Sequence, residues 1–164
     1  VTLMNAMKKN PEFKLKIVGA GPLENELKTY KEQHRLNNIE FLGYKSGEEL
    51  IQLKKQAYFT VVPSEWYENN PMAIIESYAE GVPAIGSKIG GIPEIIKEGK
   101  TGYIFTPKND KELAELIKKA ANLTREEYLT MSNNAIKFAQ KDMSKESYYN
   151  RLIPFYKQIM DIDK

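Results

Sequence analysis

Short apolar runs alternate along the chain with longer stretches in which apolar and charged residues share a helical period. The apolar runs have the length of buried strands and occupy 15–18, 39–42, 59–62, 83–86 and 103–105. The spacing of apolar residues among charged ones predicts helices over 23–36, 47–57, 71–80 and 92–97. From Asp110 onward the pattern is helical, and the last helix is predicted over 147–160.

This alternation predicts a protein of the α/β class. Helices fill the intervals between strands, whereas antiparallel hairpins would need tight turns there, so the strands are expected to run parallel. We expect a Rossmann-like doubly wound parallel sheet with helices on both faces and a helical C-terminal part. Residues 3–10 have the pattern of the last turns of a helix. We therefore expect at least one strand upstream of Val1, and a longer parent chain.

Composition narrows the function classes. The chain has 164 residues, 41% hydrophobic and 28% charged, which is typical of one globular domain. Its 24 basic and 22 acidic residues leave a net charge of +2, which does not favour nucleic acid. There is no cysteine and one histidine, His34, so disulfides, Cys-ligated metals, a cysteine nucleophile and a His-rich metal site are excluded. No apolar run approaches the length of a membrane span.

Two pairs of glycines follow predicted strands, where a doubly wound sheet binds ligands. Gly19 and Gly21 open the turn after the first strand, and a helix N-terminus there favours anions. A dinucleotide fingerprint would need a third glycine where Glu24 stands. Gly90 and Gly91 expose backbone N–H groups that could cradle an anion. A plain turn without a ligand explains Gly90 and Gly91 equally well, and it is the favoured interpretation of Gly19 and Gly21 taken alone.

The polar loop 63–71 precedes a predicted helix and carries the single tryptophan. Glu68 lies in this loop, while Glu76 and Glu80 are one helical turn apart on one face of the helix. An ionised carboxylate can accept two hydrogen bonds from a diol, which points to a sugar or a ribose. In the alternative interpretation, Glu76 and Glu80 form a solvated face and Glu68 interacts with the helix dipole.

Six aromatic residues of the C-terminal half are predicted to be packing residues rather than a stacking platform for bases. A platform would need basic residues interleaved on one surface, and the balanced charge does not support one. The six are Tyr128, Phe138, Tyr148, Tyr149, Phe155 and Tyr156.

An ordered set of motifs resembles the carboxyl-terminal half of GT4-type retaining glycosyltransferases. Glu68 and Glu76 have seven residues between them, like the paired glutamates of that family. The other matching segments are 14–23, 38–44, 63–64, 81–83, 90–94 and 99–103. Any one segment is a weak signal, but their order along nearly the whole chain is specific.

The resemblance implies one half of a GT-B fold, in which two Rossmann-like domains face each other across a cleft. Residues 1–164 would form the nucleotide-sugar-binding C-terminal domain, truncated at its N-terminus, with the acceptor-binding domain absent. The family transfers a sugar from a nucleotide-diphosphate donor, of the UDP or GDP type, with retention and without a metal or other cofactor. The isolated chain is therefore expected to be inactive.

By resemblance, several residues are assigned to the donor, none is assigned as catalytic, and none as a metal ligand. The family often has Gly-Phe-Gly after the first glutamate, and Asn69-Asn70-Pro71 in this chain leaves the sugar open. The basic residues with which the family neutralises the diphosphate would lie upstream of Val1. The donor sugar is assigned to Glu68, Asn69, Asn70, Pro71 and Met72. The nucleotide is assigned to Glu76, Gly43, Tyr44, Gly19, Gly21 and Ser64, with Gly90 and Gly91 as a candidate anion loop.

The expected partners are a nucleotide sugar, the chain's own missing N-terminal domain and a carbohydrate or lipid-linked acceptor, as in bacterial surface polysaccharide synthesis. The expected location is the cytoplasm or the inner face of the membrane. Two alternatives stay open: a non-catalytic Rossmann-like nucleotide-binding module and a nucleotide-sugar epimerase of GT-B architecture. The epimerase would need acid–base residues, for which His34 is poorly placed.

Overall fold

A computed structural model describes residues 1–162 and confirms the alternation of strands and helices. The strands are β1 (Leu15–Val18), β2 (Ile39–Gly43), β3 (Thr60–Val62), β4 (Ala84–Ser87) and β5 (Gly102–Phe105). The first helices are α1 (Thr2–Lys8), α2 (Glu24–Gln33), α3 (Gly47–Lys55), α4 (Met72–Ala79) and α5 (Ile92–Ile95). Three helices follow: α6 (Asp110–Ala121), α7 (Arg125–Asp142) and α8 (Lys145–Ile162).

The described strands pair only in parallel, as predicted. They form two sheets, with β1 beside β2 in one and the order β3-β4-β5 in the other. The residues that the structure describes therefore contain two parallel sheets and not one continuous sheet. The facing edges of the two sheets are not joined by hydrogen bonds between the described strands, and neither β1 nor β3 has a second strand partner within residues 1–162. Each of these two strands has one edge without a strand partner in this part of the chain.

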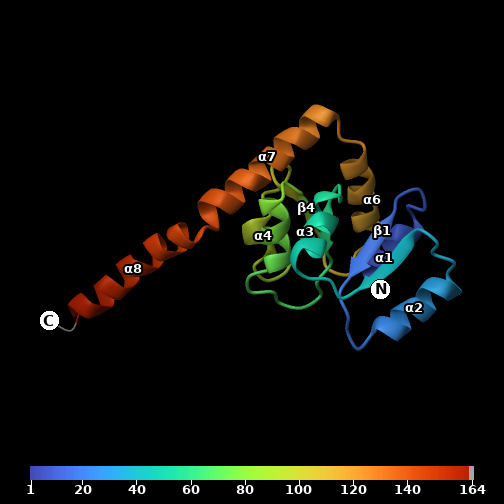
Figure 1. The fold of residues 1–164 in the computed structure, drawn as a ribbon, viewed down its shortest axis with the longest axis horizontal. Helices are drawn as coiled ribbons and strands as arrows, with labels where there is room; N and C mark the ends of the chain where they lie inside the picture. Colours follow the sequence, from blue (N-terminus) through green and yellow to red (C-terminus); the bar gives the residue numbers. More distant parts are fainter. Residues whose placement is uncertain (163–164) are drawn as a thin grey trace.

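Helix α1 packs against both sheets. Its Ala6 lies in a buried cluster with Ile85 of β4 and Phe105 of β5. Its Met4 lies in another cluster with Ile39 of β2. Because two faces of one short helix are buried in different clusters, α1 joins the sheets through apolar contacts, which are the main favourable term in folding. Figure 1 shows α1 beside β1, with α6 adjacent.

The other face of the larger sheet is covered by α4, α5 and α7. Alternate residues of a strand point to opposite faces, so Ala84 faces this group while Ile85 faces α1 and α6. Helices on both faces are thereby confirmed. Gly86 allows the closest approach, because a Cβ there would lie 2.6 Å from side-chain atoms of both Ile92 and Ile96. This packing fixes α5 against the carboxyl end of β4.

Several boundaries differ from the predictions. Helix α2 ends at Gln33 instead of residue 36, because Arg35 adopts a left-handed φ of 53° and Leu36 turns into the core. Helix α5 is a single turn, since Ile96 is already extended. Pro71, expected as the first helical residue, is the N-cap of α4. The last helix begins at Lys145, two residues before its predicted start.

The prediction of packing residues is confirmed for two of the six aromatics, whereas the other four are exposed in the part of the chain that the structure describes. The ring of Phe138 packs edge-on against Tyr78, and Tyr128 stacks on Tyr58 at 4.1 Å between centroids. In Figure 1, α8 extends away from the sheets and helices. The amphipathic spacing of the sequence predicts that α8 has an apolar face, but it does not specify which surface packs on that face. The four exposed rings on this helix belong to Tyr148, Tyr149, Phe155 and Tyr156.

Candidate functional site

The loops that follow β3 and β4 are joined by hydrogen bonds. The two strands are neighbours, so their carboxyl ends lie at one edge of the sheet. The Ser87 hydroxyl, at the end of β4, donates to the Ser64 carbonyl at 2.5 Å. The Gly91 N–H donates to the Glu68 carbonyl at 2.6 Å. Residues separated by more than 20 positions thus form one structural unit.

The glycine pair of the second loop lies directly against the backbone of the first. A Cβ on Gly90 would lie 2.4 Å from the Glu68 carbonyl oxygen, and one on Gly91 would lie 2.2 Å from that of Asn69. Gly90 also has a φ of 55°, in the region that favours glycine. Close approach therefore explains both glycines. One N–H of the predicted anion loop, that of Gly91, is already bonded to protein.

Glu68 presents its carboxylate at this edge. The Ser64 hydroxyl donates to its Oε1 at 2.8 Å. Among the described residues, no hydrogen bond or ion pair reaches Oε2. The side chain is partly buried, between a strand end and the helix that follows. A carboxylate held by one oxygen can accept hydrogen bonds from hydroxyl groups at the other.

The residues around Glu68 differ in exposure. Asn69, Asn70 and Met72 are exposed, whereas Pro71 is buried. Two aromatic side chains that the sequence analysis assigned to no ligand precede the glutamate: Trp66 is 84% exposed and Tyr67 is 87% exposed. A polar loop carrying the chain's single tryptophan was the signal that could have drawn attention to them.

Glu76 and Glu80 share one face of α4, as predicted, and that face meets α3. Lys54 forms an ion pair with Glu76, and Lys55 Nζ lies 3.4 Å from Glu80 Oε2. Lys54 is 13% exposed along its side chain, so its charge lies in a protected position. Lys54 belongs to none of the motifs recognised in the sequence. The adjacent lysines at the end of α3 were the available signal, but their partners lie on another helix.

The remaining predicted residues lie at the smaller sheet. The Gly19 N–H donates to the Gly43 carbonyl at 2.8 Å, which brings the ends of β1 and β2 together. No atom lies within 4 Å of a Cβ built on Gly21, and Tyr44 is exposed. The predicted residues therefore fall into two groups, one at each sheet. No hydrogen bond or ion pair within residues 1–162 joins the two groups.

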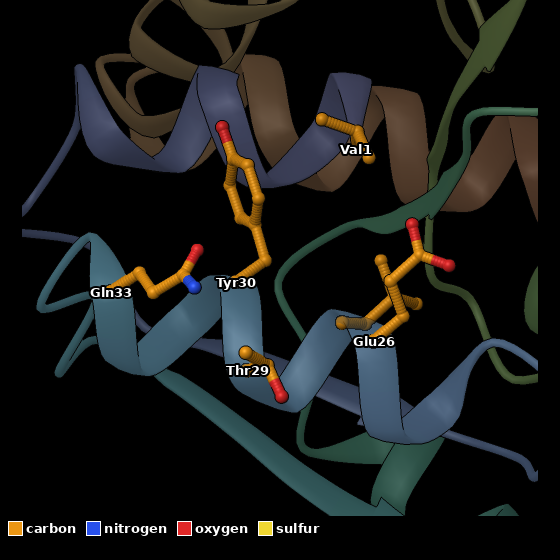
Figure 2. A pocket seen from close by; sticks show the side chains of 6 residues that line it. Val1, Glu26, Thr29, Tyr30 and Gln33 are labelled. Carbon is orange, nitrogen blue, oxygen red and sulfur yellow. The ribbon is translucent and has the colours of Figure 1, made fainter.

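A cavity of about 430 Å³ lies between the start of α1 and the side of α2 from which Tyr30 and Glu26 project (Figure 2). None of its lining residues belongs to the predicted site. Next to the lining residue Val1, the Thr2 hydroxyl donates to Glu65 at 2.8 Å, in the loop that also carries Glu68. The lining residues are Val1, Glu26, Leu27, Thr29, Tyr30 and Gln33.

Residues 1–162 contain neither a cluster of potential metal ligands nor a helix that could span a membrane. No group of three or more His, Cys, Asp or Glu side chains there could hold a metal ion. No helix within residues 1–162 combines the length and the apolar character needed to cross a bilayer.

The sequence model of the family described as glycosyl transferases group 1 matches residues 1–138. The chain belongs to this family. An uncharacterised glycosyltransferase of Methanocaldococcus jannaschii is 31% identical over 133 residues, which is 81% of this chain and 37% of that protein. The chain thus spans little more than a third of this relative's length.

Solved glycosyltransferase structures share the fold. A structure of HepE from Anabaena in complex with UDP-glucose matches with a TM-score of 0.83 and 22% identity, over 96% of this chain and 44% of that one. The C-terminal domain of a group 1 glycosyl transferase from Francisella tularensis matches with a TM-score of 0.73 and 21% identity, over 88% of this chain and 76% of that one. The α/β fold and the GT-B relationship expected from the motifs are confirmed.

Proposed function

We propose that this chain forms the donor site of a glycosyltransferase that transfers a sugar, with retention, from a UDP-type nucleotide sugar to an acceptor. The observation that carries the proposal is Glu68, whose carboxylate is held at Oε1 by Ser64 and is unbonded at Oε2 among the described residues. It stands where parallel sheets bind ligands. Family membership and the UDP-glucose bound to the Anabaena neighbour support this choice of ligand.

In this proposal, the two glutamates accept hydrogen bonds from different parts of the donor. Glu68 accepts from hydroxyls of the transferred sugar. Glu76 accepts from the ribose hydroxyls, and the Lys54 ammonium beside it orients the carboxylate through their ion pair. The N-terminus of α4 lies towards the diphosphate, where the helix dipole favours negative charge. Gly43 and Tyr44 lie towards the base.

Departure of the nucleoside diphosphate builds positive charge on the anomeric carbon and negative charge on the leaving phosphate. Positioning of the donor and stabilisation of that negative charge are therefore the main contributions that a protein can make. The described residues supply hydroxyl acceptors and a helix N-terminus. Glu68 and Glu76 act as hydroxyl binders in this proposal, not as the acid and nucleophile of a hydrolase.

A ligand panel tests the proposal. The chain is mixed in turn with UDP-glucose, a GDP sugar, NAD and FMN, and the shift in its melting temperature is measured. Binding to the native state alone raises the melting temperature. We expect UDP-glucose to stabilise the chain. Stabilisation by NAD or FMN but by neither nucleotide sugar would instead support the binding-module alternative.

The epimerase alternative finds no support in the position of His34. This residue follows α2 and precedes β2, so it lies near the amino end of a strand of the smaller sheet, whereas Glu68 follows the carboxyl end of β3 in the larger sheet. Its ring packs 4.2 Å from that of Tyr30, and its Nδ1 lies 3.4 Å from Lys8 Nζ. An acid–base residue must come within hydrogen-bond reach of the reacting group.

A further inference from the structure

A chain of two hydrogen bonds links the core of the larger sheet to the carboxylate of Glu68. Ser87, the last residue of β4, is 0% exposed, and its hydroxyl donates to the Ser64 carbonyl at 2.5 Å. The Ser64 hydroxyl then donates to Glu68 Oε1 at 2.8 Å. We propose that Ser87 and Gly91 are positioning residues that orient Glu68 for the donor sugar. This inference rests on the proposed function.

Ser87 is suited to this role because its own position is fixed. It is paired with Phe105 of β5 in a parallel ladder, and its side chain has no access to water. A buried hydroxyl must find a partner, since leaving it unsatisfied costs free energy. Its partner is a carbonyl of the loop and not of its own strand. The rigid strand therefore determines the orientation of the peptide unit at Ser64, from which the hydroxyl reaches Glu68.

Gly91 holds the other end of the same short segment. Its N–H donates to the Glu68 carbonyl at 2.6 Å, and its lack of a side chain lets Asn69 approach. The Glu68 residue is thus fixed at its carboxylate through Ser64 and at its carbonyl through Gly91. Groups held in place before the ligand arrives bind with a smaller entropic cost. The arrangement leaves Oε2 of Glu68 for the sugar hydroxyls.

This geometry predicts a separation between sugar and nucleotide recognition. Loss of the Ser87 hydroxyl should misplace Glu68 and weaken UDP-glucose binding, but UDP lacks the sugar that Glu68 would hold. For Ser87→Ala we expect the Kd for UDP-glucose to rise about tenfold and the Kd for UDP to change less than about twofold. Gly91→Ala, which places a Cβ against Asn69, should produce the same separation.

Ser132→Ala is the matched control. The Ser132 hydroxyl also donates to a backbone carbonyl, that of Gly81, at 2.6 Å, but it does so between α7 and the end of α4. This variant removes an equivalent bond without touching the loop of Glu68. Both ligands should bind it as they bind the unmodified chain. If Ser87→Ala resembles Ser132→Ala in its Kd for UDP-glucose, the inference is overturned.

Amide hydrogen exchange separates this inference from the proposed function, because it needs no ligand. The Gly91 N–H is bonded to the Glu68 carbonyl, so its exchange reports whether the loop is held. We expect Ser87→Ala to exchange this amide about tenfold faster than the unmodified chain, with no change in Ser132→Ala. Should the unmodified chain bind no nucleotide sugar, the proposed function fails. Unchanged exchange in Ser87→Ala would then overturn the positioning role as well, and faster exchange would support it.

Discussion

Lys54 of α3 forms an ion pair with Glu76 of α4, although the two residues lie 22 positions apart in the sequence. The Lys54 side chain is mostly buried, whereas that of Glu76 is 48% exposed. The ammonium therefore fixes one side of a carboxylate whose other side is open to solvent. In the proposed donor site, the open side accepts the ribose hydroxyls.

Replacing Lys54 should weaken binding of the nucleotide and not only lower the stability of the fold. We expect Lys54→Ala to raise the Kd values for UDP and UDP-glucose by a similar factor, about three- to tenfold, because Glu76 loses its orientation. The free energy of unfolding should fall by only about 1 kcal/mol or less, because the Glu76 side of the ion pair is exposed to solvent, which screens the interaction. Calorimetric titration and urea denaturation measure the two effects.

Lys55→Ala is the control for that experiment. Lys55 follows Lys54 directly, and its Nζ lies 3.4 Å from Oε2 of Glu80, one turn after Glu76, so its replacement reports the loss of a neighbouring charge. It should leave both Kd values nearly unchanged. Equal effects of the two substitutions would mean that general surface charge, and not the orientation of Glu76, determines binding.

Glu68→Gln should weaken binding of UDP-glucose without weakening binding of UDP. The amide keeps the size of the side chain but loses the charge that strengthens hydrogen bonds from sugar hydroxyls. We expect the Kd for UDP-glucose to rise about tenfold while that for UDP changes little. Glu65→Gln, three residues earlier and bonded to Thr2, is the comparison variant and should bind both ligands normally. A parallel loss of UDP binding in Glu68→Gln would argue against a role in sugar recognition.

Glu76→Ala should weaken the binding of UDP and of UDP-glucose by a similar factor. Because UDP and UDP-glucose carry the same ribose, removal of its acceptor raises both Kd values by about tenfold in our proposal. Glu80→Ala, one turn further along α4, should have little effect, since its partner is Lys55. Titration of the two variants with both ligands checks this. Unaltered binding by Glu76→Ala would contradict the assignment of Glu76 to the ribose.

Gly86→Ala should destabilise the fold through a steric clash. The added methyl group would lie 2.6 Å from atoms of Ile92 and Ile96, so α5 must move away from β4. Overpacking of this kind costs roughly 1–3 kcal/mol, which should appear as a lower urea midpoint. Gly21→Ala serves as the reference, because no atom lies within 4 Å of its Cβ position. A midpoint for Gly86→Ala equal to that of Gly21→Ala would mean that the helix adjusts without cost.

The sequence alone determined most of the local structure. Apolar runs bounded by glycine and proline located every strand to within about one residue, and their alternation with helices predicted parallel pairing. The four-residue spacing of Glu76 and Glu80 placed both on one face of a helix, since that face repeats with the helical turn. These properties depend on neighbours along the chain, and the sequence records such neighbours directly.

The tertiary structure decided which residues these helices, strands and loops contact. The pattern could not show that Gly91 bonds to the Glu68 backbone, that Lys54 pairs with Glu76, or that the aromatic residues of α8 are exposed. It also could not show that the described strands divide into two sheets. Each of these facts depends on residues far apart in sequence, and their distances are set by how helices and strands pack. Spacing along the chain fixes the direction of a side chain, while packing alone fixes its partner.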